Sequence, residues 1–438
     1  MIRFASLTGL FVAALAVPAA ADDSIDSISD SGPSIAPTGI MAPISIVEGP
    51  GIKVGEGTVL HPILGLETGF VSNAFYEETD PVATGILRLV AQIHTASLSR
   101  QRLAIPDGND IPENLGSHQY RAGLRLSYDL YLSGRDSLQD QGGLGVGALL
   151  RGHVLPQSTW SFLYLDNFER VIRATNFESQ ERTNRDINRL QLGVQFAPEG
   201  RSVKGLLHVE NVIDYFEDDT QQFANRMQNS VGLSVSWRFR PVTVFFGDLT
   251  QGYFTGIGDS TKVDSFPLTV AGGIQTLLSL KTTLVARIGY TNGFYESGPN
   301  FSAILGGLQF GYRYTPTGRI TGLYEYTHQD SINANFYRDH AVRLNIEQEL
   351  APFLLTLAPE ARLRRYQGVT RVVPGGSDTR DDVILSVTGG LRYHFRDSLA
   401  GIIEYRLTAV ETDYMTGVFG DDPSYVRHEI IAGVRAAL

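Results

Sequence analysis

The feature that most constrains the fold is a two-residue alternation, which is plainest in the segment Tyr120–Tyr131, Y-R-A-G-L-R-L-S-Y-D-L-Y. Every second residue is apolar or tyrosine, and the residues between them are mostly charged or small. Because successive side chains of a strand point to opposite faces, this segment predicts a strand with one apolar face and one wet face. Aromatic residues at both ends of a short apolar band are typical of strands that cross an outer membrane. A strand of a soluble sandwich also alternates, so one segment does not distinguish a sandwich from a membrane barrel. The recurrence of the pattern along the chain does.

The alternation recurs in about eighteen segments up to the last residue, by the period-two test. The least regular is Thr159–Ile172. The sequence therefore predicts an all-β fold, a transmembrane antiparallel β-barrel of about 18 strands within a range of about 14 to 18. The segments are Val59–Val71, Gly85–His94, Gln119–Tyr131, Leu144–Val154, Thr159–Ile172, Asn188–Phe196, Val203–Ile213, Ser230–Phe239, Val242–Thr250, Phe266–Leu277, Thr283–Tyr290, Ser302–Tyr314, Arg319–Thr327, His340–Glu349, Leu354–Tyr366, Val383–Phe395, Leu399–Ala409 and Val426–Leu438.

The connections between segments alternate in length, which supports the barrel independently. After the even-numbered segments they are mostly tight turns rich in Pro, Gly, Asp and Ser, such as Arg240-Pro241 and Ala351-Pro352. After the odd-numbered segments they are longer and acidic, as in Glu217-Asp218-Asp219. Short periplasmic turns and longer external loops are expected of a bacterial outer-membrane barrel. Ser97–Gly116 is long on the short-turn side, so it is either a periplasmic insertion or a sign of a wrong strand count.

Composition excludes several other classes of protein. After the first twenty residues, no apolar run approaches the roughly 20 residues that a spanning helix needs, so a helical membrane protein is excluded. The net charge of −11 argues against a nucleic-acid binder, which would be basic. The absence of Cys suits an oxidising periplasm.

The N-terminal part of the chain predicts export. Residues 1–21 have the positive start, apolar stretch and small-residue end of a signal peptide. Residues 22–57 are rich in Ser, Asp, Pro and Gly without a period, and predict a disordered periplasmic tail that serves as a linker, with a plug in the lumen as the alternative. Residues 58–438 are predicted to form the barrel. The expected location is the bacterial outer membrane, with the N-terminus periplasmic and the long acidic loops external.

The wet face of the strands is rich in arginine, and the chain has only four lysines. One interpretation is a set of salt-bridge ladders between neighbouring strands that stiffens the lumen. The other is a positive constriction that favours anionic solutes or acidic glycans. Arg362 and Arg364, with Arg365 beside Tyr366, are the densest local group. The candidates for lining the pore are Arg121, Arg125, Arg189, Arg238, Arg313, Arg343, Arg362, Arg364, Arg392, Arg406, Glu325, Glu347 and Glu404.

Enzyme motifs are missing from the sequence. There is no H-E-x-x-H and no G-x-S-x-G, so no catalytic residue, metal or cofactor is expected. A lipid hydrolase would need a His and a Ser on neighbouring lipid-facing positions, and His340 and His428 do fall on that phase. The partners expected are outer-membrane lipid and lipopolysaccharide, and no nucleic acid.

The segment Ile52–Glu77 resembles the opening of the beta-barrel porin 2 family. The match is the stretch E-G-T-x-L-H-P at Glu56–Pro62, followed by S-N-x-F-Y at Ser72–Tyr76. Looser similarity continues at Arg182–Asn188 and Val242–Tyr253. The resemblance implies an outer-membrane barrel connected in some members with exopolysaccharide secretion, and so polysaccharide-secretion machinery as a candidate partner.

The function expected is thus a porin-like channel with an Arg-rich lumen that serves polysaccharide export. Two alternatives stay open. One is a structural or adhesive surface barrel with a closed lumen, and the other is an outer-membrane lipid hydrolase. The closing segment ends on Leu438, whereas outer-membrane barrels often end on an aromatic residue.

Overall fold

The computed structural model describes residues 51–54, 58–97, 117–140, 142–172, 184–198, 202–369, 378–413 and 423–438. The predicted signal peptide and most of the predicted tail lie outside these residues. In the described part of the chain, no helix is long and apolar enough to cross a membrane.

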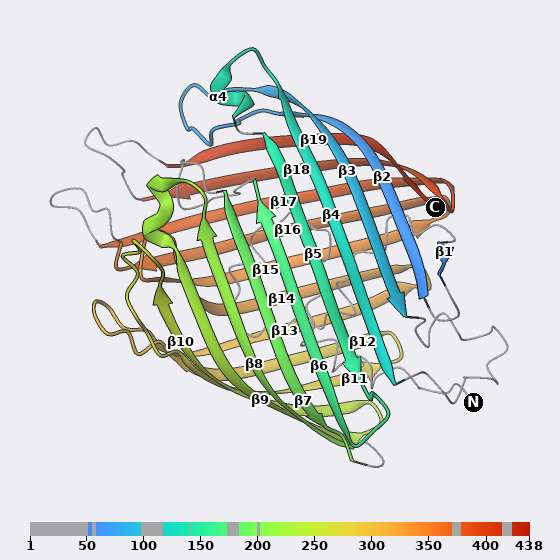
Figure 1. Ribbon diagram of the computed structural model, residues 1–438, viewed down its shortest axis with the longest axis vertical. Coiled ribbons are helices and arrows are strands. Elements are labelled where there is room, and N and C mark those ends of the chain that lie inside the picture. Colours follow the sequence, from blue (N-terminus) through green and yellow to red (C-terminus); the bar gives the residue numbers. More distant parts are fainter. Residues whose placement is uncertain are drawn as a thin grey trace.

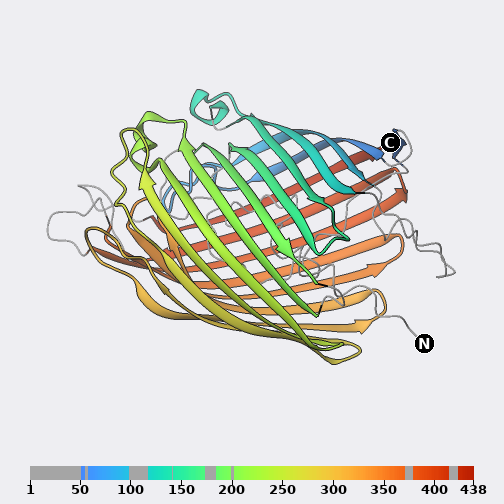
Figure 2. The ribbon, with the colours of Figure 1, turned by 60° about the horizontal axis from the view of Figure 1, so that its bottom comes forward.

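The described chain forms one closed antiparallel β-barrel, as Figures 1 and 2 show from two directions. Strands β2 to β19 follow one another around the wall in chain order, and β19 pairs with β2 from Glu429↔Val71 to Ala437↔Ile63. The predicted fold class and the eighteen-strand count are confirmed. The barrel strands are β2 (Thr58–Val71), β3 (Thr84–Ser97), β4 (His118–Leu132), β5 (Gly143–Val154), β6 (Trp160–Val171), β7 (Arg185–Phe196), β8 (Val203–Phe216), β9 (Arg226–Arg240), β10 (Thr243–Gly256), β11 (Leu268–Ser279), β12 (Thr282–Asn292), β13 (Ser302–Thr315), β14 (Gly318–Asp330), β15 (Phe336–Leu350), β16 (Phe353–Gln367), β17 (Thr379–Arg396), β18 (Leu399–Thr412) and β19 (Tyr425–Ala437).

The two faces of each strand differ as the alternation predicts, and β16 illustrates it. Leu363 is 59% exposed, whereas its neighbour Arg364 is 4% exposed. Leu355 and Leu357 share the exposed phase of Leu363. Because the sheet closes on itself, the phase of Leu363 faces outward and the phase of Arg364 faces inward. An apolar outer surface is what a barrel in a lipid bilayer requires.

The connections alternate between short and long around the barrel, as the sequence predicts. One end of the barrel, the short-turn end, has turns as tight as the two residues between β9 and β10 or between β15 and β16. The opposite end, the long-loop end, has the longer connections. β3 and β4 are hydrogen-bonded neighbours, so the strand count is correct on both sides of the long connection between them. Most of that connection lies outside the described residues.

The seam of the barrel has an additional short strand, β1 (Ile52–Lys53). It pairs with β2 through Ile52↔Leu60 and Lys53↔Val59, just beyond the stretch of β2 that β19 covers. In Figure 1, β1 lies beside the C-terminal end of the chain. Two residues that the sequence analysis assigned to the tail thus complete the edge of β2 at the short-turn end.

A small cluster of Ala400 and Ala437 lies at the short-turn end, and further clusters of buried apolar residues lie at the long-loop end. Here lie a cluster of Val71, Ile86 and Tyr131 and another of Phe216, Ala224 and Ile332. The two short helices of the described chain, α4 (Asp136–Gln139) and the 3-10 helix η2 (Asp219–Ala224), belong to long connections at the same end. The clusters at the long-loop end therefore stabilise the connections there.

Candidate functional site: the inward face and the long-loop mouth

A ladder of charges crosses β15 and β16 on the inward face. Arg364 donates two hydrogen bonds to Asp339, of 2.8 and 2.7 Å. Its guanidinium carbon also lies 3.8 Å from the ring centroid of Tyr337. Asp339 and Arg364 are cross-strand partners in the sheet, so the register places them opposite each other.

The same ladder continues toward the middle of the barrel. Arg362 lies 3.8 Å from Asp339 and pairs with Glu360, and Arg343 donates to Glu360 at 2.7 Å. Three arginines therefore share two carboxylates. Buried charges are tolerated only when they are paired and hydrogen-bonded, so this group forms a stiff part of the wall.

A second ladder closes the seam between the first and last strands. Arg88 on β3 donates to Asp129 on β4 at 2.8 Å and lies 3.4 Å from Glu67 on β2. Glu67 also accepts from Arg435 on β19 at 2.8 Å. These four residues join the first three barrel strands to the last one, and they make the seam polar on the inside.

Most of the other predicted pore-lining residues also have partners. Arg189 lies 3.8 Å from Glu210, Arg406 lies 3.1 Å from Glu404, and Glu347 pairs with Arg319. Four more candidates have polar or electrostatic contacts of their own: Arg125, Arg238, Arg392 and Glu325. The structure therefore brings Arg343, Arg362 and Arg364 into one cluster and leaves the remaining candidates spread around the wall.

Three arginines near the short-turn end differ from these ladders. Arg121 on β4 and Arg151 on β5 are direct cross-strand partners on the inward face. Neither forms an ion pair with a described residue, and the same holds for Arg313 near the end of β13. Like charges directly opposite each other are unfavourable in a sheet, and no described carboxylate pairs with any of these three arginines.

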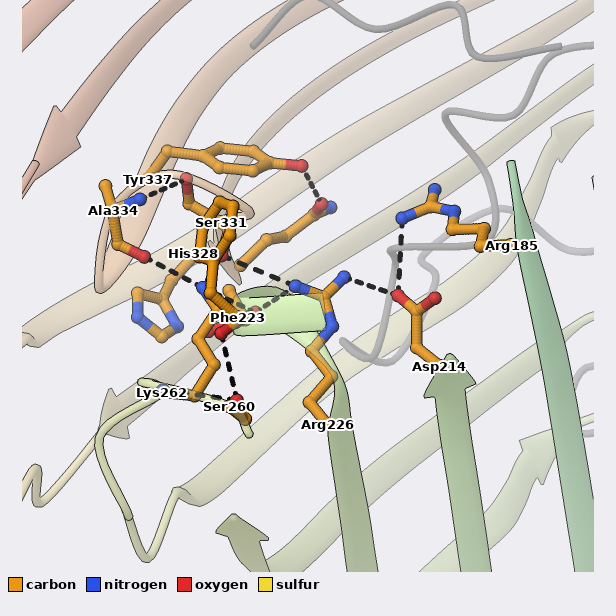
Figure 3. Close-up of polar contacts among 12 residues, drawn as sticks. Arg185, Asp214, Phe223, Arg226, Ser260, Lys262, His328, Ser331, Ala334 and Tyr337 are labelled. Atoms are coloured by element: carbon orange, nitrogen blue, oxygen red, sulfur yellow. Dashed lines mark hydrogen bonds and ion pairs between the residues drawn. The ribbon is translucent and has the colours of Figure 1, made fainter. Parts of the chain in front are cut away.

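The long-loop mouth has a buried charge network (Figure 3). Arg226, the first residue of β9, donates to Asp214 of β8 at 2.7 Å and also pairs with Asp330, the last residue of β14. Asp214 further lies 3.3 Å from Arg185 of β7. Four strands separate β9 from β14 in the barrel order. The network therefore ties two separate parts of the rim together.

Lys262, from the connection between β10 and β11, holds the β14–β15 turn in the same network. Its ammonium donates to the carbonyl oxygen of Ala334 at 3.0 Å and to that of Ser331, and it lies 3.6 Å from Asp330. The Lys262 side chain is buried. Burial of an ammonium requires several acceptors, and the turn supplies them.

Backbone hydrogen bonds link the neighbouring long connections into a collar, defined as residues 217–225, 257–267, 293–301 and 331–335. Thr261 N–H donates to Phe223 at 2.9 Å, and Glu296 N–H donates to Asp264 at 2.9 Å. Asn335 N–H donates to Gln367 at 3.1 Å, which joins the collar to β16. The first three connections thus satisfy polar backbone groups of one another, and the fourth is joined to β16.

Aromatic rings fill the collar between β12 and β15. Phe301 stacks on His328 with centroids 4.0 Å apart, and Tyr295 stacks on Phe336 at 5.5 Å. Burial raises the pKa of the Tyr295 hydroxyl well above its usual value, and the nearby Asp330 raises it further. Tyr295 therefore stays neutral and serves as a packing group.

The residues of the mouth network were not predicted from the sequence, because they lie at the ends of strands or in loops. The alternating segments ended at Ile213 and Thr327, whereas β8 and β14 continue to Phe216 and Asp330. Asp214 continues the inward series His208, Glu210 and Val212. Extending each alternation by a few residues would have included it. Lys262 follows no period, and only the folded loop reveals its role.

The residues considered for enzyme activity have other contacts. His340 Nδ1 forms a hydrogen bond of 3.0 Å with the hydroxyl of Tyr324. His428 Nδ1 forms one of 2.8 Å with the hydroxyl of Tyr405. One His–Ser pair, His153 and Ser161 at 2.8 Å, lies on the inward face, but Ser161 is 0% exposed. No group of three or more potential metal ligands occurs among the described residues.

No protein-family model and no curated protein matches the chain. Among solved structures, it is similar to OprD of Pseudomonas aeruginosa, at 10% identity, with a TM-score of 0.44, over 90% of this chain and 98% of that one. It is also similar to OccK2 (OpdF) of the same species, at 12% identity, with a TM-score of 0.45, over 86% of this chain and 98% of that one. OpdK of this species, solved with vanillate, aligns at 10% identity, with a TM-score of 0.44, over 86% and 99%. At such low scores the likeness carries no argument, so the fold rests on the chain's own strand pairing.

Proposed function

We propose that this chain is an outer-membrane porin whose lumen passes small solutes by diffusion. In this proposal the short turns and the N-terminus are periplasmic and the long loops are external. The observation that carries the proposal is the contrast between the two faces of a closed eighteen-strand wall, apolar outside and densely charged inside. Barrels of about 16 to 18 strands leave an aqueous channel unless something fills it. We propose that the thirteen residues predicted to line the pore face this channel.

We further propose that the channel prefers anions. The ladders on β15–β16 and at the seam are internally paired, so they contribute little net charge. Arg121, Arg151 and Arg313 add positive charge that no described carboxylate neutralises. A ring of fixed positive charge lowers the energy of anions in a pore. The short-turn end is therefore the proposed selectivity region.

Single-channel recording in a planar bilayer under a salt gradient tests this proposal. The protein should begin at Asp22, and a second form should lack residues 22–50, so that β1 is retained. We expect stepwise conductance with a reversal potential on the anion side. Replacing Arg121 and Arg151 by Gln should move the reversal potential toward zero and leave the steps in place, because two positive charges leave the lumen.

Arg365→Gln is the matched control. Arg365 lies on the outward phase of β16, is half exposed and pairs with Asp381 at 2.5 Å. Its removal takes away one positive charge outside the lumen, so the anion preference should not change. If neither form conducts although circular dichroism shows that both are folded, the porin proposal is contradicted.

A structural barrel with a closed mouth is the second candidate, because the collar specifically favours it. Arg226 and Lys262 hold the β14–β15 turn against neighbouring loops at the long-loop end. A barrel closed by the collar predicts no conductance from either form, and conductance that appears when the mouth network is broken. Conductance that appears only on removal of residues 22–50 would instead identify that segment as a plug.

Export of polysaccharide has no support beyond the family resemblance. The outer membrane as location rests on the apolar belt and on the export signal that the first 21 residues predict. Small solutes are therefore the substrate class of this proposal, and polysaccharide-secretion machinery is not part of it.

A further inference from the structure

The apolar outer surface has a group of adjacent polar side chains on β6 to β9. Four polar side chains on four neighbouring strands form what we call the outward polar band: Asp166, Asn188, Asn211 and Asn229. Their strands are β6, β7, β8 and β9 in that order. Thr159–Ile172, the least regular alternating segment of the sequence, contains the first of them.

The alternation shows that these side chains face outward. Asn188 shares its phase with the exposed Leu190 and Leu192, and Asn211 shares its phase with the exposed Leu207 and Val209. Asp166 and Asn229 likewise alternate with exposed apolar residues, including Phe162 on β6 and Val231 on β9. The band therefore lies on the surface that faces lipid.

Three of the four band residues have apolar or aromatic neighbours on both sides in the outward series of their strands. On β6, Asp166 has Tyr164 below it and Phe168 above it in the outward series. On β8, Asn211 lies between Val209 and Ile213, with the exposed Tyr215 farther toward the long-loop end. Asn188 differs, because the outward residue beyond it toward the long-loop end is Asp186.

Hydrogen bonds connect the band in pairs. Asn188 Nδ2 donates to Asp166 Oδ1 at 2.9 Å, and Asn211 Nδ2 donates to Asn229 Oδ1 at 2.8 Å. Leu190 is the cross-strand partner of both Asp166 and Asn211, so the two pairs are adjacent. An amide has two N–H donors and an acceptor oxygen, and these bonds use only part of that capacity.

Lipid tails offer no hydrogen-bond partner for the remaining groups. Polar and charged side chains within a membrane are therefore unfavourable on a lipid-facing surface and are typically found at contacts with other protein. β3, β4 and β17 show the ordinary arrangement, because their outward residues between the ends are apolar or small. The four polar side chains on β6 to β9 therefore favour contact with another protein surface over contact with lipid.

We propose that the outward polar band is the interface with a second copy of this chain, related by a two-fold axis. Asparagine amides both donate and accept, so the band is complementary to itself, as a two-fold contact requires. Toward the long-loop end the same side of the barrel has both signs of charge, with Arg170 paired to Glu217 at 2.5 Å. A self-complementary face fits an identical copy better than a partner of one charge sign. The inference rests on the membrane-spanning barrel and does not require channel activity.

Cysteine crosslinking in membranes tests the interface, because the chain has no native Cys. Single cysteines at positions 166, 188, 211 and 229 should be introduced one at a time and treated with a short bismaleimide. We expect a dimer from at least one position, with a yield at least about tenfold above the control Leu385→Cys, whose site is exposed on the outward face of β17. Equal yields at all sites, or crosslinks only to a different protein, would overturn the proposal.

A second measurement is independent of crosslinking geometry. The double variant Asn211→Leu/Asn229→Leu should fold at least as well as the wild-type chain, because both side chains would then suit lipid. In native mass spectrometry from lipid nanodiscs, the wild-type chain should be mainly dimeric and the variant mainly monomeric. A monomeric wild-type chain, or a variant that remains dimeric, would overturn the proposal. Single-channel recording of the monomeric variant separates this outcome from failure of the proposed porin.

Discussion

At the scale of single residues, Arg226 connects parts of the chain that are 104 positions apart, since it pairs with Asp330 as well as with Asp214. All three side chains are largely buried. Removing one member of a buried pair leaves an uncompensated charge, which costs more than the pair itself contributes. The strength of the mouth network therefore depends on this one guanidinium.

We expect Arg226→Met to lower the free energy of unfolding by about 3–5 kcal/mol, the usual cost of breaking a buried pair. Urea unfolding in lipid vesicles would measure it. Arg170→Met is the matched control, since Arg170 and Glu217 are 38% and 29% exposed, and exposed pairs contribute about 0 to 1 kcal/mol. An equal loss in the two variants would show that the mouth network has no special role.

At the scale of elements, the β14–β15 turn depends on contacts with other connections. Lys262 donates to two of its carbonyl oxygens, and Ile332 packs against Phe216 and Ala224. Asn335 lies against Gly298, where an added Cβ would come within 2.6 Å of its side-chain nitrogen. The turn is thus held by its neighbours, because five residues cannot bury a core of their own.

Lys262→Met should release this turn without unfolding the barrel, because the strand pairing is unaffected. Hydrogen exchange of the Asn335 amide, which donates to Gln367, should become faster by at least about tenfold, which corresponds to about 1.4 kcal/mol of lost local stability. Lys281→Met, at an exposed short turn, should leave that exchange rate unchanged. Unchanged protection in both variants would mean that Lys262 does not hold the turn.

At the scale of the whole molecule, closure depends on the pairing of β19 with β2. Nine cross-strand pairs and the ladder of Arg435, Glu67 and Arg88 form this seam. Without it, both strands would expose unpaired backbone groups to lipid, which a membrane barrel does not tolerate. The last strand is therefore needed for the integrity of all the others.

Deletion of residues 430–438 should prevent formation of the barrel, because it removes most of the partners of β2. The shift in electrophoretic mobility between heated and unheated samples would be lost. Deletion of residues 22–50 is the control, since it leaves every described strand intact and should keep the shift. A truncated chain that still shows the shift would contradict this view of the seam.

Strand number, strand order and the outward residues could be predicted from the sequence, because alternation with a period of two is a local property of extended chain. The interpretation of the inward arginines as salt-bridge ladders also agrees with the pairs of Arg343, Arg362 and Arg364. The pore lining itself stays a prediction. Residues such as Asp339 were missed, because the apolar alternation fades where strands leave the membrane.

Two features depended on the folded barrel alone. The first is the mouth network, since Arg226 and Asp330 meet only because closure and register bring distant strand ends to one rim. The second is the outward polar band, whose residues lie on separate strands and form one surface only beside their neighbours. Local periodicity specifies which face a side chain is on, whereas its neighbours are specified by cross-strand register, and register is a tertiary property.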